Sequence, residues 1–114
     1  MTDEEWQKLQ EKYGEGNIAA VEVSPGRWIG FCKPTRAEYD RWFDQQSADK
    51  KNQTKYAREL EQACVVWPGA GKGDPVGHEA FKQALDHNPS LTMCECLDAV
   101  TGLAGLADRA NIRK

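Results

Sequence analysis

The segment spanning residues 31–43 constrains the fold most, because it ends a strand and begins a helix within a few residues. Pro34 cannot donate a backbone N–H to a sheet and disfavours helical geometry at the residue before it. A strand that precedes it must therefore end there. Thr35 and Glu38 then match a capping box, in which each side chain accepts a hydrogen bond from the other residue's backbone N–H. This pattern predicts a helix over residues 35–47.

Two β-favouring runs precede this junction, at residues 18–23 and 27–32. Between them lies Ser24-Pro25-Gly26, in which proline presets the first corner of a turn and glycine accepts the positive φ of the second. We therefore predict a β-hairpin over residues 18–32. Because a two-stranded hairpin is marginal in water on its own, we expect it to pack on helices.

Apolar residues at steps of three and four predict the other helices. A capping box of Thr2 and Glu5 begins the first one, and Pro68 ends the one with the clearest apolar stripe. The aromatic bulk of the core is expected from Trp28, Trp42, Tyr56, Trp67 and Phe81. The predicted helices are 3–13, 35–47, 54–67, 78–87 and 90–106, and residues 68–77 form a glycine-rich loop. The predicted fold class is α+β, mainly α: one N-terminal β-hairpin packed on a bundle of about five helices, in a single domain over residues 1–114.

Composition narrows the classes of function. The 114 residues suit one domain. The 15 Lys plus Arg against 18 Asp plus Glu leave a net charge of −3, so the chain lacks the broad positive field that attracts nucleic acid. The apolar runs are too short for a membrane span, and the acidic start Thr2-Asp3-Glu4-Glu5 is unlike a signal peptide. We therefore expect a cytoplasmic protein that binds neither nucleic acid nor membrane.

The four cysteines, at 32, 64, 94 and 96, have two interpretations. Free cysteines in a reducing compartment are usually small buried hydrophobes, and this is the interpretation we favour. A zinc site is the alternative, although Cys94 and Cys96 have one residue between them where zinc ligands generally have two to four. His78 and His87 do not stand at the sequence intervals that are typical of metal ligands. We expect no metal and no cofactor.

Catalytic signals are weak. The acidic residues fall mostly on the polar faces of predicted helices, where water keeps them ionised, and neither histidine has a local reason to pair with a cysteine. The run GAGKG at residues 69–73 lacks the first glycine and the hydroxyl residue of a phosphate-binding loop, and it follows a helix instead of a strand. We expect no enzymatic activity and no small-molecule substrate.

Two blocks of sequence resemble a known family. They are FCKPTRAEYDRWF at residues 31–43 and LEQACVVWP at 60–68, followed by Phe81 and the helix start NPSL at 88–91. Together they resemble small tail assembly chaperones of long-tailed bacteriophages and prophages, over about residues 28–106. The resemblance implies a non-enzymatic protein of the host bacterial cytoplasm. It would bind the tape measure protein before the tail tube forms, hand over to the tail tube protein, and act in many copies, as a homo-oligomer would.

The sequence suggests two surfaces for such partners. One is the open edge of the hairpin, which carries Val21 and Val23. The other is the last helix, which is apolar on more than one side and carries Leu97, Leu103 and Leu106. The aromatic residues of the helix at 35–47 are instead expected in the core. The competing function is a small cysteine-containing regulator that binds metal or nucleic acid.

Overall fold

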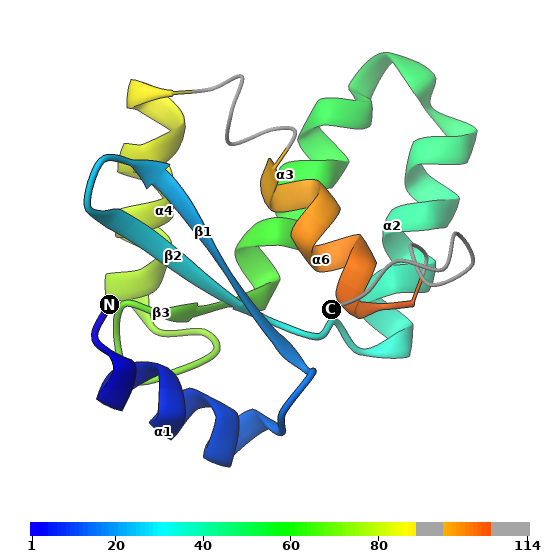
Figure 1. Cartoon of the computed structure of the whole chain (residues 1–114). Helices are drawn as coiled ribbons and strands as arrows, with labels where there is room; N and C mark the ends of the chain where they lie inside the picture. The colour runs from blue at the N-terminus through cyan, green and yellow to red at the C-terminus, as the bar shows by residue number, and fades with distance from the viewer. Residues whose placement is uncertain (89–94, 106–114) are drawn as a thin grey trace.

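The fold is built on a three-stranded antiparallel sheet of order β1-β2-β3 (Figure 1). The computed structural model describes residues 1–88 and 95–105. The predicted fold class, α+β and mainly helical, is confirmed. Its elements in chain order are α1 (Asp3–Tyr13), β1 (Ile18–Ser24), β2 (Arg27–Cys32), α2 (Arg36–Ala48), the 3₁₀ helix η1 (Lys50–Asn52), α3 (Gln53–Cys64), β3 (Val65–Trp67), α4 (Pro75–His87) and α6 (Leu97–Leu103).

The hairpin forms as predicted. β1 and β2 are antiparallel, with Val21 opposite Ile29, and Gly26 takes a φ of 77° in the turn between them. Both predicted capping boxes are also present. Thr2 caps α1 with Glu5, and Thr35 caps α2 with Glu38.

The third strand corrects the predicted helix at 54–67. α3 ends at Cys64, and residues 65–67 form β3, in which Val65 lies opposite Phe31 of β2. The stripe at steps of three and four runs on to Trp67, but two consecutive valines favour extended backbone because their branched side chains pack well on a pleated sheet. The hairpin is therefore part of a larger sheet that connects directly to α3.

α4 begins earlier than predicted. Asp74 accepts a hydrogen bond from the backbone N–H of Val76, and Pro75 occupies the first turn, where its missing N–H costs nothing. The helix at 78–87 therefore starts at Pro75, and the glycine-rich loop shortens to residues 68–74. Of the helix predicted at 90–106, the structure shows α6; residues 89–94 and 106 lie outside the described part of the chain.

Helices cover both faces of the sheet. On one face a Cβ added at Gly30 would lie 3.0 Å from Cβ of Trp67 and 3.6 Å from Cδ1 of Leu9, so α1 packs closely there. On the other face Phe31 meets Phe81 of α4, ring edge to ring face, at 5.9 Å between centroids. These two phenylalanines, 0% and 1% exposed, are the aromatic centre of the core, whereas Trp28 is 37% exposed. The expected core role of Trp28 is therefore wrong.

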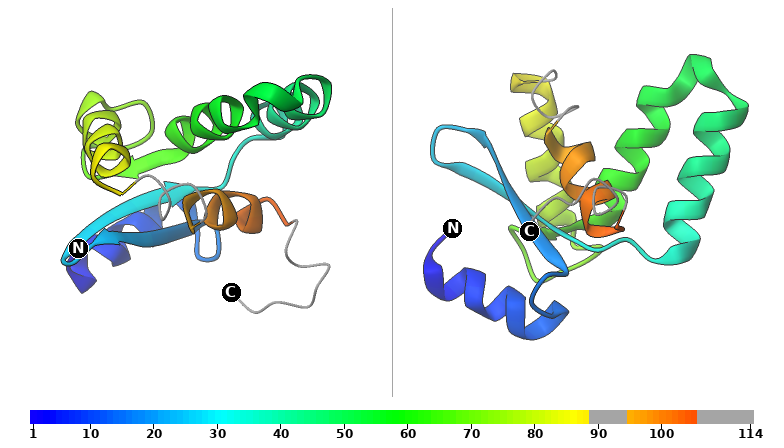
Figure 2. Two further views of the ribbon diagram at one scale, coloured as in Figure 1. Left: turned by 90° about the horizontal axis from the view of Figure 1, so that it is seen from above. Right: turned by 45° about the vertical axis from the view of Figure 1, so that its right-hand side comes forward.

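The α2–α3 pair extends away from the sheet. Figure 2 shows the two helices side by side at one end of the molecule. α2 makes its main contacts with α3 and η1, whereas α3 also contacts α6 and β2. Within the described ranges, no helix is both long and apolar enough to cross a membrane.

Candidate partner-binding site

Among the α-helices of residues 1–88 and 95–105, α2 alone has no buried residue. None of its 13 residues is buried, although it carries three aromatic side chains. Helices in globular proteins normally bury an apolar stripe, and α2 buries its stripe only partly, against α3. The helix therefore presents apolar surface at the end of the molecule that projects from the sheet.

The three rings of α2 form an aromatic cluster, which we define as Tyr39, Trp42 and Phe43. The ring centroids of Tyr39 and Phe43 are 6.5 Å apart in a nearly parallel stack, because residues four apart share a helix face. The ring centroid of Trp42 lies 5.5 Å from that of Tyr39 and 6.4 Å from that of Phe43. Phe43 is 50% exposed. The expected core position of this cluster is wrong for Phe43, which faces solvent.

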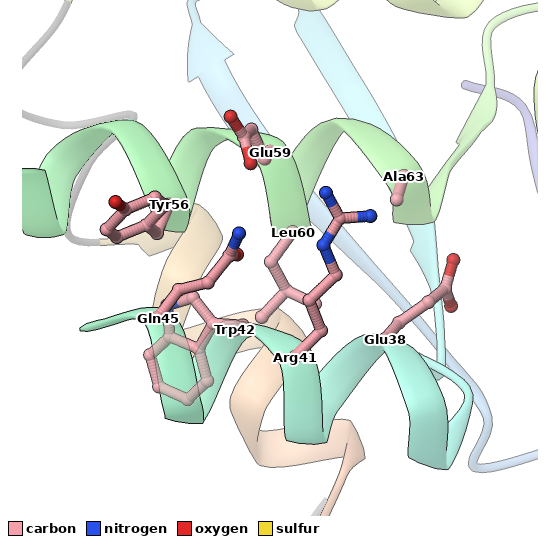
Figure 3. A pocket seen from close by; sticks show the side chains of 8 residues that line it. All are labelled: Glu38, Arg41, Trp42, Gln45, Tyr56, Glu59, Leu60 and Ala63. Atoms are coloured by element: carbon pink, nitrogen blue, oxygen red, sulfur yellow. The ribbon is translucent and has the colours of Figure 1, made fainter. Parts of the chain in front are cut away.

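A groove runs between α2 and α3 beside the cluster. It encloses about 330 Å³, and in Figure 3 Arg41 and Gln45 reach from α2 toward α3. Apolar side chains alternate with charged ones along it, so the groove offers both an apolar contact and charges of both signs. Its lining residues are Glu38, Arg41, Trp42, Gln45, Tyr56, Glu59, Leu60 and Ala63.

Polar contacts hold both ends of the groove. At one end the Lys72 ammonium lies 2.7 Å from a carboxylate oxygen of Glu38, which ties α2 to the glycine-rich loop. At the other end the Tyr56 hydroxyl donates to Asp49 at 2.9 Å. Hydrogen bonds from Asn52 and Tyr56 lower the pKa of Asp49. The first contact joins α2 to the glycine-rich loop, and the second joins α3 to the C-terminal end of α2.

The partner-binding residues predicted from the sequence lie elsewhere. Val23 and Leu103 are 2% and 7% exposed and belong to the buried interior, so neither presents a surface to a partner. Val21 and Leu97 are partly buried against the core. Leu106 lies outside the described residues. Both valines of β1 thus contribute to the core.

Glu61 departs from the expectation that acidic residues lie on solvated faces. It is 0% exposed on the inner side of α3, with Arg58 at 3.0 Å from Oε1. Within the described residues Oε2 has no hydrogen-bond partner. Burial raises the pKa of Glu61 to about 7, against the opposing effect of Arg58. The sequence signal for this burial was the spacing of Glu61 with Ala57 and Cys64, which share its helix face.

Replacing Glu61 by glutamine should make stability less dependent on pH. Because the pKa of Glu61 is above its ordinary 4.5, the folded chain binds this proton more tightly than the unfolded chain. This tighter proton binding adds to the free energy of unfolding. The added free energy is fully present below pH 4.5 and is lost as pH rises through 7. Relative to Glu61→Gln, the wild type should lose about 2–3 kcal/mol between pH 4 and pH 8 in urea unfolding. The exposed neighbour supplies the control: Glu59→Gln should follow the wild type, and a parallel pH profile for Glu61→Gln would contradict the prediction.

The described cysteines are buried free thiols, at positions 32, 64 and 96, as expected for this residue type. Across residues 1–88 and 95–105, no group of three or more His, Cys, Asp or Glu side chains could hold a metal ion. Cys94, which the alternative of a zinc site would use with Cys96, lies outside these ranges. The candidate site of the described residues is therefore the aromatic cluster and the groove between α2 and α3.

Comparison of the chain with protein-family models, with curated proteins and with solved structures found no match.

Proposed function

We propose that the chain is a non-enzymatic tail assembly chaperone of a long-tailed bacteriophage or prophage. In this role it works in the cytoplasm of the bacterial host, binds the tape measure protein, and assists assembly of the tail tube. The sequence blocks at residues 31–43 and 60–68 support the proposal by their resemblance to that family. They also contain the first eight residues of α2 and the end of α3, the two helices that carry the candidate surface.

The observation that carries the proposal is the aromatic cluster of α2, in which Phe43 is half exposed. A half-exposed ring adds less to folding than a buried one, whereas aromatic anchors are the side chains that dominate protein–protein binding. Phe43 is 50% exposed and is stacked on Tyr39, so the ring is held in place before a partner arrives. A preorganised anchor lowers the entropy cost of binding.

The ligand that fits this surface is an amphipathic helix. Such a helix would place apolar residues at steps of three and four against the aromatic cluster. Its polar flank would meet the charges of the groove, since Arg41 and Glu59 offer a positive and a negative partner. A single short contact of this kind is weak and exchangeable. Many copies along one long partner would still hold it in solution, through multivalency.

Coexpression tests the proposed function. The chain is produced together with the tape measure protein encoded next to it, and separately the tape measure protein is produced alone. We expect the tape measure protein to be insoluble alone and to copurify with the chain as a soluble complex. A tape measure protein that stays insoluble, or that is soluble without forming a complex, would count against the proposal.

A further inference from the structure

Cys32 and Cys64 lie opposite each other where the sheet meets α3. Cys32 ends β2, and Cys64 is the last residue of α3, directly before β3. In the antiparallel register Phe31 is opposite Val65, so the next pair along the two chains is Cys32 and Cys64. Their thiols are also hydrogen bonded to each other.

An ion pair lies next to the two thiols. Cys32 is 4% exposed and Cys64 is 0% exposed, while the side chains of Lys72 and Glu38 beside them are partly exposed. The ammonium of Lys72 interacts electrostatically with both sulfur atoms. Lys72 thus places a positive charge near the pair, and such a charge favours a thiolate.

The two thiols are not equivalent. The hydrogen bond from Cys64, with help from Lys72, lowers the pKa of Cys32, against the effects of burial and Glu38. The same hydrogen bond, with burial, raises the pKa of Cys64. Burial raises the pKa of Cys96 to about 12. Cys32 is thus the nucleophile of the pair, and Cys64 is the thiol that donates to it.

We propose that Cys32 and Cys64 form an oxidisable dithiol site that reacts with hydrogen peroxide and closes to a disulfide at the base of the α2–α3 pair. In the first step the Cys32 thiolate attacks one peroxide oxygen. The O–O bond breaks, and hydroxide leaves and takes a proton to become water. The sulfur of Cys64 then attacks the sulfenic sulfur, the S–O bond breaks, and the second water leaves with the Cys64 proton. The two thiols supply the two electrons that reduce the peroxide.

The disulfide would enclose a defined part of the fold. The covalent loop from Cys32 to Cys64 contains all of α2, η1 and α3, which are the elements of the candidate binding surface. A crosslink restricts the unfolded chain and so raises stability when the native geometry accepts it. We therefore expect oxidation to raise the Tm of the protein. This inference does not depend on the proposed chaperone function.

Peptide mapping after oxidation tests the site. The full chain is treated with hydrogen peroxide under native conditions, remaining thiols are alkylated, and a tryptic digest is made without reductant. We expect one linked pair of peptides, carrying Cys32 and Cys64, and a loss of about two mass units from the intact chain. The reaction rate should rise with pH, as the Cys32 thiolate forms. A folded wild type that keeps all its thiols, or that links mainly Cys94 or Cys96, would overturn the proposal.

Variants separate the two roles. Cys64→Ala should stop at a sulfenic acid on Cys32, trapped by a cyclic diketone, whereas Cys32→Ala should form neither product. Cys96→Ala, which removes another buried thiol, should react like the wild type. If the buried variants fail to fold, Lys72→Met reports on the same site from the surface. It should slow disulfide formation at pH 7 by roughly threefold or more, because the Cys32 thiolate loses its neighbouring positive charge. An unchanged rate would contradict the role of Lys72.

Discussion

Replacing Phe31 by alanine should lower the free energy of unfolding by about 3–5 kcal/mol. The ring is 0% exposed and packs edge to face against Phe81 at 5.9 Å, between the sheet and α4. Its removal leaves a cavity at the point where β2 meets both β3 and α4. Because small domains are stable by only about 5–15 kcal/mol, much of the variant population should be unfolded at 37 °C. Urea unfolding followed by circular dichroism measures the change.

A second phenylalanine supplies the matched control for this prediction. Phe43→Ala removes the same side chain from α2, where it is 50% exposed. We expect it to lower the free energy of unfolding by about 1 kcal/mol or less, because much of that ring is already in water. Equal losses for Phe31→Ala and Phe43→Ala would show that the packing described for the core is wrong.

Replacing Phe43 by aspartate should abolish most binding of the tape measure protein without unfolding the chain. Under the proposed function this ring is an anchor for an amphipathic helix, and truncation of a central aromatic anchor commonly costs about 2 kcal/mol, or roughly 30-fold in Kd. The carboxylate adds the cost of a charge at an apolar contact. The measurement is affinity for purified tape measure protein, with circular dichroism to verify the fold.

Val76→Asp is the control for the binding experiment. Val76 is 57% exposed on α4, outside the aromatic cluster and the groove. It therefore tests the effect of a new surface charge on an exposed apolar position. We expect affinity within about twofold of the wild type. A loss as large as that of Phe43→Asp would mean that α2 has no special role.

Local chemistry made several elements predictable from the sequence. The two capping boxes depend on residues three apart, so Thr2 with Glu5 and Thr35 with Glu38 fix the starts of α1 and α2 wherever the helices later pack. The turn between β1 and β2 is likewise a local feature, because it depends on the positive φ that Gly26 adopts. These features need no knowledge of the tertiary structure, and all three are present.

The third strand was not predictable from the same evidence. Val65 and Val66 continue the apolar stripe of α3, and a short apolar run has the same appearance at a helix end and in a buried strand. What decides between them is the free edge of β2, which pairs with Val65 and Trp67. That pairing also places Cys32 opposite Cys64, so the dithiol could not be recognised before the sheet was known.

The candidate surface shows a limit of periodicity. Tyr39, Trp42 and Phe43 mark an apolar face, but the pattern alone does not say how much of that face another element covers. α3 covers only part of it, and Phe43 stays exposed. The reverse happens on α3, where Glu61 lies among apolar residues and is buried, because α6 packs against that helix. Burial in both cases depends on contacts distant in sequence.

Hydrogen exchange of the chain with and without the tape measure protein tests the binding surface most directly. Because a bound helix shields the elements that it touches, we expect slower exchange in peptides from residues 36–48 and 53–64 in the complex. Peptides from β1, residues 18–24, should exchange at the same rate in both states. Protection confined to β1, or no protection in α2, would contradict the assignment of the aromatic cluster as the surface that holds the partner.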